Sequence, residues 1–453
     1  MTDAKPSRLS RRAFLKSAAS AAGAASAAVS SMSGAPTIVP GRVFQSSAPS
    51  DTLSFGCIGV GRQGRDDMRE LIYRGLQTGA RVTAVCDIDA HRAEAAQWLA
   101  ERVYGKELGL DKKPAVAVFR DFRELLARAD IDAVVVATPD HWHAPMAVAA
   151  ANAGKDIYLE KPLTYSVSEG RALVAAVRRS KRVLQVGSQQ RSQVYFRIAC
   201  EAARNSRVGK VHTIRVWNPV DSGRGDPTPQ PIPKYLDYAF WMGPTADAPF
   251  TEDRVHPQVG YGRPGWLQIE RYCRGMITGW GSHMNDIAQW GNGSDDTGPV
   301  EISAKGEFPD RGLFDVHTVY SSEGLYANGV RLLQETGDPA GVRFEGDRGW
   351  IFCSREKVEA SDPAFLRQKP GPGEVRLDVS PNHMRNFIEC VRSRKDPIAP
   401  VEAGHRSNTI CCITHIAMKL GRKLRWDPKA ERFIGDDEAN KMLDYPHREP
   451  WTV

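Results

Sequence analysis

Between residue 52 and about residue 190, short apolar runs alternate with longer stretches of helical periodicity. Apolar residues that recur every three to four positions predict helices, and short continuous apolar runs predict buried strands. The predicted strands are 53–60, 81–86, 116–119, 133–138, 156–159 and 183–186, and the helices between them are 62–73, 90–103, 121–129, 144–153 and 168–180. Strands alternating with helices of this length favour an α/β fold, with a parallel sheet covered on both faces. We place this domain at residues 50–190.

The pattern changes beyond residue 190. A Pro/Gly-rich stretch without periodicity covers 219–265 and is too long for an ordinary connection. Around it we predict helices at 193–203, 382–391 and 404–420, and strands at 211–217, 301–304, 315–320, 330–333, 342–345 and 350–353. Consecutive strands favour an antiparallel sheet in a second, α+β domain. This domain is placed at residues 191–430, and residues 431–453 are predicted to form a C-terminal tail.

The N-terminal segment differs in character from the rest of the chain. Residues 1–16 hold five basic residues and one Asp, which is +4 of the formal net charge of +7, and an Ala/Ser/Gly run follows to residue 33. A basic start, a weakly apolar run and small residues beyond it fit an export signal. The pair Arg11-Arg12, followed by Phe14-Leu15-Lys16, resembles the twin-arginine motif. We expect residues 1–45 to be a twin-arginine signal peptide and linker, read by the twin-arginine translocation machinery, and the protein to be periplasmic or secreted. The alternative is an Ala/Ser tail with a chance Arg pair.

The composition of the remainder excludes several classes of protein. Its 56 basic and 53 acidic residues leave only +3, which gives little support to nucleic-acid binding. After the signal, no run of 18 uncharged apolar residues exists, so no integral membrane span is expected in the mature protein. The eight cysteines contain no C-x-x-C pair, so neither a disulfide scaffold nor a zinc knuckle is indicated.

A glycine motif follows the first predicted strand. In Gly59-Val60-Gly61-Arg62-Gln63-Gly64, Gly59 permits a tight turn, Gly61 lets a pyrophosphate approach the backbone, and Gly64 allows close packing of the next helix. Asp87 closes the second strand, where it would bind the adenosine ribose and repel a 2′-phosphate. The motif predicts a dinucleotide site for NAD, with NADP also open because Arg62 or Arg92 could soften the preference. The alternative is a glycine turn without a ligand.

Two further segments carry a family resemblance. The run Val134–Asp140 leads into His141-Trp142-His143, and Glu160-Lys161-Pro162 follows another strand. With the glycine motif, these segments resemble the Gfo/Idh/MocA oxidoreductases, named for glucose–fructose oxidoreductase, inositol dehydrogenase and a rhizopine-catabolism protein. The resemblance implies an NAD(P)-binding Rossmann domain followed by a domain with a large open, mainly antiparallel sheet, a homo-oligomer, and sugars or polyols as substrates. It also implies cofactor-binding roles for Arg62, Gln63, Thr138, Pro139, His143, Glu160 and Lys161; His143 could instead cap its helix.

Lys161 is the first candidate catalytic residue. It ends a parallel strand, where ligands bind in this architecture. A lysine beside a carboxylate, here Glu160, can accept or relay the hydroxyl proton that leaves when a carbinol loses a hydride. The plain alternative is a surface lysine. A cis peptide bond before Pro162 is open.

His283 and Asp286 form the second candidate catalytic pair. They are three residues apart and share one face of a helix. The family places an aspartate four residues before this histidine, but this chain has Gly279 there. His283 is therefore the expected acid/base partner of Lys161, and Asp286 could supply the missing carboxylate. A locally bonded helix-start histidine and half a metal site are the alternatives; no metal site is predicted.

Candidate substrate residues surround the predicted pocket. Gln190 and Arg191 follow the last Rossmann strand, and Trp217, Trp266 and Tyr272 could pack on the C–H faces of a sugar together with His283. Any of these aromatic residues could instead belong to the core.

Three functions remain open at this stage. The first is an exported NAD(P)-dependent oxidoreductase that acts on the CH–OH group of a sugar, glycoside or cyclic polyol by hydride transfer to nicotinamide. The second keeps the cofactor tightly bound and recycles it, with net dismutation, epimerisation or redox-assisted glycoside cleavage, because free NAD is scarce outside the cytoplasm. The third is a non-catalytic sugar-binding protein.

Overall fold

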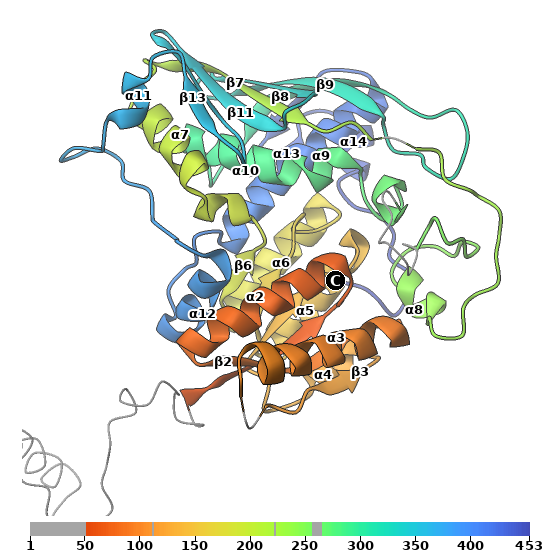
Figure 1. Cartoon of the computed structure of the whole chain (residues 1–453). Coiled ribbons are helices and arrows are strands. Elements are labelled where there is room, and N and C mark those ends of the chain that lie inside the picture. Colours follow the sequence, from red (N-terminus) through yellow and green to blue (C-terminus); the bar gives the residue numbers. More distant parts are fainter. Residues whose placement is uncertain (1–50, 111–112, 222, 256–264) are drawn as a thin grey trace, which may run out of the picture. The chain divides into compact units, whose positions relative to one another are not determined.

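The computed structural model describes residues 51–453, except 111–112, 222 and 256–264 (Figure 1). The predicted signal peptide, residues 1–45, lies outside the described residues. Two sheets organise the described part of the chain.

The first sheet has six parallel strands in the order β3-β2-β1-β4-β5-β6. Its strands are β1 (Leu53–Ile58), β2 (Ala80–Cys86), β3 (Ala117–Phe119), β4 (Ala133–Val136), β5 (Asp156–Leu159) and β6 (Leu184–Val186); its helices are α2 (Arg62–Thr78), α3 (Ala90–Arg102), α4 (Phe122–Leu126), α5 (His143–Asn152) and α6 (Val167–Ser180), with a π-helical turn η2 (Val103–Glu107) after α3. All four residues of β4 are buried, as expected for a parallel strand covered on both faces. The predicted Rossmann-type arrangement is confirmed.

One helix from late in the chain completes this first layer. Helix α12 (His383–Ser393) packs on α2, where Asn382 Nδ2 donates to Glu70 Oε1 at 2.6 Å, and the centroid of its Phe387 ring lies 6.0 Å from that of Phe55 on β1. We predicted α12 as part of the second domain. Its periodicity reveals an apolar face but not which sheet that face covers.

The second sheet has nine strands in the order β13-β12-β11-β7-β10-β9-β8-β14-β15. They are β7 (Val211–Asn218), β8 (Pro299–Glu307), β9 (Val319–Tyr326), β10 (Arg331–Thr336), β11 (Gly341–Gly346), β12 (Gly349–Cys353), β13 (Val358–Ala360), β14 (Leu424–Asp427) and β15 (Arg432–Phe433). Only the β7–β10 pair is parallel among the strand pairs of this described sheet, so the prediction of a mainly antiparallel sheet is confirmed.

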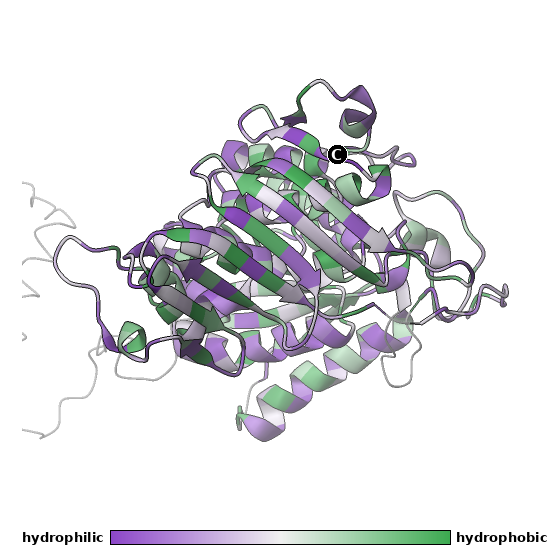
Figure 2. Cartoon of the chain, turned by 90° about the horizontal axis from the view of Figure 1, so that it is seen from above, coloured by the Kyte–Doolittle hydropathy of each residue, from purple (hydrophilic) through white to green (hydrophobic). Residues whose placement is uncertain are grey.

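Helices cover one face of the second sheet. Helices α7 (Val194–Arg204), α10 (Gly281–Asn292) and α13 (Val401–Leu420) lie between this sheet and the first domain (Figure 1). Their apolar residues form two cores with the strands. The other face, seen in Figure 2, mixes hydrophilic and hydrophobic residues. Within the described residues, no helix is at once long enough and apolar enough to cross a membrane.

Two element predictions were wrong in the second domain. The strand predicted at 315–320 begins only at Val319. Asp315 is bonded to another segment instead, because its Oδ1 accepts a hydrogen bond from Glu270 N at 2.6 Å. The predicted tail contains β15 and helix α14 (Asp437–Lys441). A two-residue strand is too short to show an alternating pattern.

The described residues 223–255 and 265–275 of the irregular stretch form a wall, and their apolar side chains cluster with Leu313 and Phe314. It holds only the short helices α8 (Tyr238–Met242) and η5 (Gly265–Gln268) among its described residues, and α9 (Met276–Gly279) follows. Trp451 packs on this wall, with its ring stacked on Phe240 at 5.0 Å between centroids and edge-on to Trp142 at 4.7 Å. The last residues of the chain therefore brace the wall against the first domain.

Candidate active site

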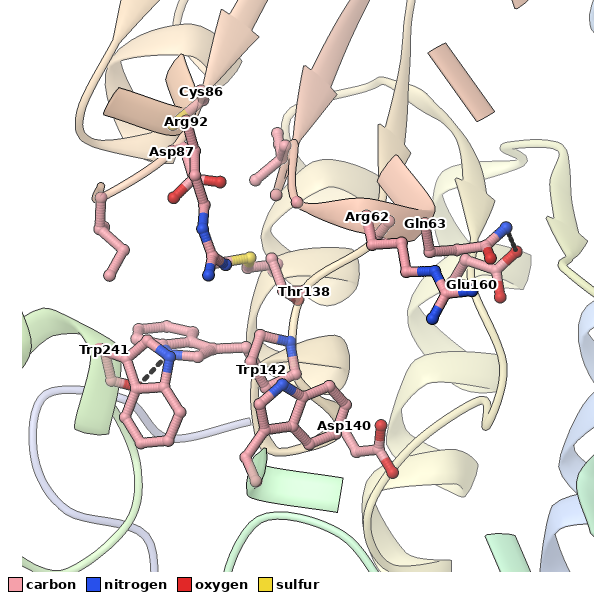
Figure 3. Close-up of a pocket in the computed structure, with 18 of the residues that line it drawn as sticks. Arg62, Gln63, Cys86, Asp87, Arg92, Thr138, Asp140, Trp142, Glu160 and Trp241 are labelled. Carbon is pink, nitrogen blue, oxygen red and sulfur yellow. Dashed lines mark hydrogen bonds between the residues drawn. The ribbon is translucent and has the colours of Figure 1, made fainter. Parts of the chain in front are cut away.

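A cleft of about 370 Å³ opens where the strands of the first sheet end (Figure 3). Ligands bind at this edge in open parallel sheets. Ten of the residues singled out from the sequence line it: Gly59, Gly61, Arg62, Gln63, Asp87, Thr138, Pro139, Glu160, Lys161 and Trp266. The fold thus gathers the glycine motif, Asp87 and the Glu160-Lys161-Pro162 segment at one site.

The glycine turn has the geometry of a diphosphate cradle. Gly59 has φ +77°, and a Cβ there would lie 2.7 Å from Ala137 O. A Cβ on Gly64 would overlap the carbonyl oxygen of Gly59. Helix α2 begins directly after Gly61 with no side-chain cap, so its first N–H groups and its positive end are available to an anion. These residues fit the diphosphate of a dinucleotide.

Asp87 lies at the ribose end of the cleft. Its Oδ2 accepts a hydrogen bond from Val60 N at 2.9 Å and its Oδ1 accepts one from Asp89 N at 3.0 Å, so the carboxyl is fixed against the glycine turn. Burial raises its pKa, and the neighbouring Arg92 partly offsets this effect. Arg92 and Arg120 also line the cleft. The arrangement fits the ribose-binding role predicted for Asp87.

Glu160 and Lys161 follow β5 in a tightly bonded segment. Glu160 Oε2 accepts from Lys161 N at 3.1 Å and Oε1 accepts from Gln189 Nε2 at 2.6 Å. The Lys161–Pro162 peptide is cis. Lys161 Nζ donates to the carbonyl oxygen of Gly279 at 3.0 Å, so its amine crosses from the first domain to α9. Glu160 therefore holds the backbone of the segment while the amine of Lys161 lies in the cleft.

A second cavity of about 450 Å³ adjoins the cleft at Lys161. His283, on α10, lines it with Gly279 and Trp280. The imidazole is buried, and its Nδ1 has no hydrogen-bond partner among the described residues. Burial, then the charges of Lys161 and Arg355, hold the pKa of His283 well below its usual range, so the ring is neutral near pH 7. The predicted pair of Lys161 and His283 thus faces one shared pocket.

Asp286 and Arg191 do not reach this pocket. Arg191 Nε donates to Asp286 Oδ2 at 2.7 Å and Nη2 to Oδ1 at 2.8 Å, while Nη1 and Nη2 donate to Asp295 at 3.0 and 2.8 Å. Neither Arg191 nor Asp286 is found among the described residues that line the two cavities. The structure does not bring Asp286 or Arg191 into the pocket for the predicted proton-transfer and substrate roles, because the two side chains bind each other.

Two aromatic residues predicted for the substrate pocket also lie elsewhere. Trp217 lies on the open face of the second sheet, where its Nε1 donates to Glu335 Oε1 at 2.9 Å. Tyr272 is fully buried in the wall cluster and its hydroxyl accepts from Arg254 Nη1 at 3.1 Å. Tyr272 is a core residue, the alternative considered above.

His143 and Gln190 are buried beside the site. The His143 ring nitrogens face Pro162 O at 2.6 Å and Thr138 O at 2.9 Å, so the ring ties together the two loops that form the cleft floor. The amide of Gln190, oriented to satisfy its neighbours, donates to His283 O at 3.3 Å and accepts from Arg355 Nε at 3.2 Å. Both residues act behind the walls of the two cavities.

Asp140 and Arg355 are among the cavity-lining residues that the sequence analysis did not predict. Asp140, directly after Pro139, lines the cleft at 3% exposure. Burial raises its pKa to about 7, against a hydrogen bond with Cys273 and the charge of Lys161. Arg355, in the turn between β12 and β13, lines both cavities and its Cζ lies 4.5 Å from the centroid of the Trp280 ring. Asp140 stood inside a segment already noted, whereas nothing in the sequence links Arg355 to the site.

Family models match both domains. One described as an oxidoreductase family with an NAD-binding Rossmann fold matches residues 53–188. Another, described as an oxidoreductase family C-terminal alpha/beta domain, matches residues 206–453.

Curated relatives match only part of the chain. Inositol 2-dehydrogenase of Salmonella typhimurium is 34% identical over 142 residues, which is 31% of this chain and 38% of the relative. The uncharacterized oxidoreductase YrbE of Bacillus subtilis is 30% identical over 188 residues, 42% of this chain and 48% of the relative. The aligned part thus spans less than half the length of these relatives.

Solved structures extend the likeness to both domains. WlbA dehydrogenase from Bordetella pertussis, solved with NADH and UDP-GlcNAcA, has a TM-score of 0.60 at 18% identity, with 83% of this chain and 99% of that chain covered. Levoglucosan dehydrogenase, solved with NADH and levoglucosan, has a TM-score of 0.57 at 17% identity, with 83% and 99% covered. At these identities the likeness establishes the fold. Because the two family models together span both sheets, the chain belongs to the Gfo/Idh/MocA oxidoreductase family.

Proposed function

We propose that this protein is an NAD(P)-dependent oxidoreductase acting on the CH–OH group of a sugar, glycoside or cyclic polyol. One observation carries the proposal: the amine of Lys161 lies where the dinucleotide cleft meets the cavity lined by His283. A substrate hydroxyl in that cavity would lie between a hydrogen-bond donor and a neutral imidazole. Those are the groups needed to handle a hydroxyl proton.

The nicotinamide of a bound cofactor would supply a hydride acceptor, and this chain would supply positioning and proton transfer. Lys161 Nζ, held by Gly279 O at 3.0 Å, would donate a hydrogen bond to the substrate oxygen. His283 is neutral, and its Nδ1 has no partner among the described residues, so it would orient the substrate hydroxyl toward Lys161. Glu160 would keep the segment in place through Gln189 and the backbone of Lys161.

Sugars and polyols are the substrate class that the relatives support. Curated relatives are named inositol 2-dehydrogenase, and structural neighbours were solved with UDP-GlcNAcA or levoglucosan. In this chain, Trp266 and Trp280 line the cavities and offer aromatic faces to ring C–H groups. NAD is the expected cofactor, because the fixed carboxyl of Asp87 would repel a 2′-phosphate.

The test is a panel of sugars, glycosides and inositols with NAD and with NADP, followed by absorbance of reduced nicotinamide. Turnover of at least one compound, lost in Lys161→Met, supports the proposal. Tight binding of a sugar without any turnover, equal in wild type and Lys161→Met, would favour a non-catalytic sugar-binding protein.

A second candidate is internal recycling of a tightly held cofactor after twin-arginine export. It is favoured by Arg11-Arg12 and by the aromatic wall of Phe240, Trp241 and Trp451 beside the cleft. The net reaction would be dismutation, epimerisation or glycoside cleavage through a transient keto sugar. Native mass spectrometry after long dialysis separates the candidates: retained nucleotide favours recycling, and an empty, freely exchanging site favours an ordinary dehydrogenase.

The open face of the second sheet also supports a homo-oligomer. It carries Trp217 and an ion pair between Arg215 and Glu345 at 3.1 Å. Light scattering of the purified protein, compared with a Trp217→Glu variant, tests this: a wild-type oligomer that dissociates in the variant supports it, and a monomeric wild type contradicts it.

A further inference from the structure

The proposed reaction needs a final acceptor for the hydroxyl proton, and two acids near the site, Glu160 and Asp286, are already engaged by hydrogen bonds. Lys161 itself is anchored on Gly279 O, a carbonyl that cannot take a proton at neutral pH. Glu160 accepts hydrogen bonds on both oxygens. Asp286 is held on both oxygens by Arg191. A proton that reaches Lys161 therefore needs another carboxylate from which to leave.

Asp140 lines the cofactor cleft itself, whereas Asp67, another buried carboxyl that the charge of Lys161 affects, lines only the second cavity. It follows β4 as the first residue of the turn η3 (Asp140–Trp142), at the edge of the sheet where the cofactor cleft opens. It lines the same cleft as Lys161 and Gly279, and Figure 3 shows it among the side chains that line this cleft. Trp142 Nε1 donates a hydrogen bond to Trp241 O at 3.0 Å, so this N–H group is not available to the carboxyl oxygens of Asp140.

The groups around Asp140 leave its charge finely balanced. Burial favours the neutral acid and raises its pKa to about 7. The thiol of Cys273 and the charge of Lys161 favour the carboxylate, and Glu160 opposes it. Cys412, on α13, is a further titratable group near Asp140: burial raises the pKa of its thiol, and a negative charge on Asp140 raises it further. A buried carboxyl with one nearby ammonium changes its protonation near neutral pH, as a group that exchanges protons during turnover must.

We propose that Asp140 is the proton-relay residue of this cleft, receiving through Lys161 the proton that the substrate hydroxyl loses. The inference rests on the proposed function. In that reaction the substrate C–H bond would give its hydride to the cofactor while its O–H bond breaks. The hydroxyl proton would go to Lys161 Nζ, and a proton would pass from Lys161 across the cleft, by way of solvent, to the Asp140 carboxylate. The carbonyl product and the reduced cofactor form, Lys161 keeps its charge, and Asp140 becomes neutral. Release of that proton through the cleft to water resets the site.

The first test is the pH–rate profile of Asp140→Asn, which keeps the size of the side chain. The wild type is expected to lose activity below about pH 7, where Asp140 is protonated. Turnover by Asp140→Asn is expected to be about 100-fold slower at pH 8 and not to fall further below pH 7. Asp140→Glu is expected to recover part of the rate and part of the pH dependence. An unchanged profile and rate in Asp140→Asn would overturn the proposal.

The second test needs no turnover. Calorimetric titration of the protein with NAD⁺ at pH 7, in two buffers of different ionisation enthalpy, counts released protons. The positive nicotinamide ring favours the carboxylate, so the wild type should release a fraction of a proton that Asp140→Asn does not. Equal proton release in the two proteins, with NAD⁺ bound in both, would contradict the proposal.

Asp221→Asn is the matched control for both tests. Asp221 is also a buried carboxyl with its pKa raised to about 7 by burial, but its oxygens accept from Gln268 Nε2 at 3.1 Å and Met276 N at 2.6 Å, away from the cleft. It should keep the wild-type proton release and pH limb. If no sugar is turned over by the wild type, the proposed function fails, and the calorimetry still decides whether Asp140 titrates with the cofactor.

Discussion

The cofactor cleft and the cluster around Arg191 each hold a buried carboxyl, Asp140 and Asp286, but the partners of these two carboxyls differ. In the cleft, Asp140 faces one ammonium group, and its pKa is raised to about 7. Behind the cleft, Asp286 and Asp295 share one guanidinium in a bidentate arrangement. Although burial opposes it, the two carboxylates raise the pKa of Arg191 further above its usual range.

This difference in partners distinguishes a carboxylate that stays charged, such as Asp286, from a carboxyl that can change its protonation, such as Asp140. A guanidinium stays protonated at all ordinary pH values and fixes its partners as carboxylates. A carboxyl beside one lysine in a cleft can gain or lose its proton at small free-energy cost. Burial by itself therefore does not identify a functional acid; the number and type of its partners do.

The largest effect is expected from breaking the Arg191 cluster. Arg191→Met leaves the buried carboxylate of Asp286 and the half-buried carboxylate of Asp295 without this cation, and should lower the free energy of unfolding by about 3–5 kcal/mol. Denaturant unfolding measures this. Arg331→Met, which breaks the exposed pair with Glu323, is the control and should change stability by about 0–1 kcal/mol. A loss in Arg191→Met no larger than in the control would contradict the comparison.

The next effect is expected in the cleft, on rate and not on stability. Lys161→Met should lower turnover about 10³-fold, with cofactor affinity changed only a few-fold, because the amine acts on the proton and not on the diphosphate. Lys155→Met is the control: its Nζ is bonded to Arg128 O and Ile131 O outside the cleft, at 2.6 and 2.7 Å, so stability should fall and the turnover of folded protein should not. If Lys161→Met kept the wild-type turnover, Lys161 would have no role in proton transfer.

The two regions should also respond oppositely to pH. Although burial opposes it, hydrogen bonds from Arg171 and His405 lower the pKa of Glu431 to about 2. Its stabilisation is present above the unfolded pKa of about 4.3 and lost as pH falls toward 2. Asp140, whose pKa is raised, contributes stability that is present below about pH 4 and lost as pH rises to about 7.

Melting temperatures across pH 2–8 check these signs. Glu431→Gln should weaken the loss of stability on the acid side, and Asp140→Asn should weaken the decline between about pH 4 and 7. Curves parallel to wild type in both variants would mean that neither group titrates as its surroundings indicate.

The smallest effect is expected at the ribose end. Asp87→Asn removes the negative charge but keeps acceptor geometry, so the ratio of NADP to NAD affinity should rise about tenfold. Dissociation constants for both dinucleotides measure it. Asp89→Asn, at the start of α3, keeps its capping function and should leave the ratio unchanged.

Local patterns predicted the first domain and the cleft, because the information is local there. The buried run of β4, the glycine turn and the Glu160-Lys161-Pro162 segment each lie within a few residues of the strand that positions them. Partners distant in sequence were not predictable in this way. Arg191 meets Asp286 across 95 positions, and Arg355 enters the cavity from a hairpin turn. The face of a strand that carries Trp217 depends on which helices cover the sheet, which periodicity does not give.

The indoles along the cleft give this protein an internal optical reporter. Trp142, Trp241 and Trp266 line the same cleft that would hold the dinucleotide. Indole emission overlaps the absorption band of a reduced pyridine nucleotide, so energy transfer would quench the protein and excite the ligand. Protein purified with reduced nucleotide already bound would show blue fluorescence on ultraviolet excitation, before any substrate is added.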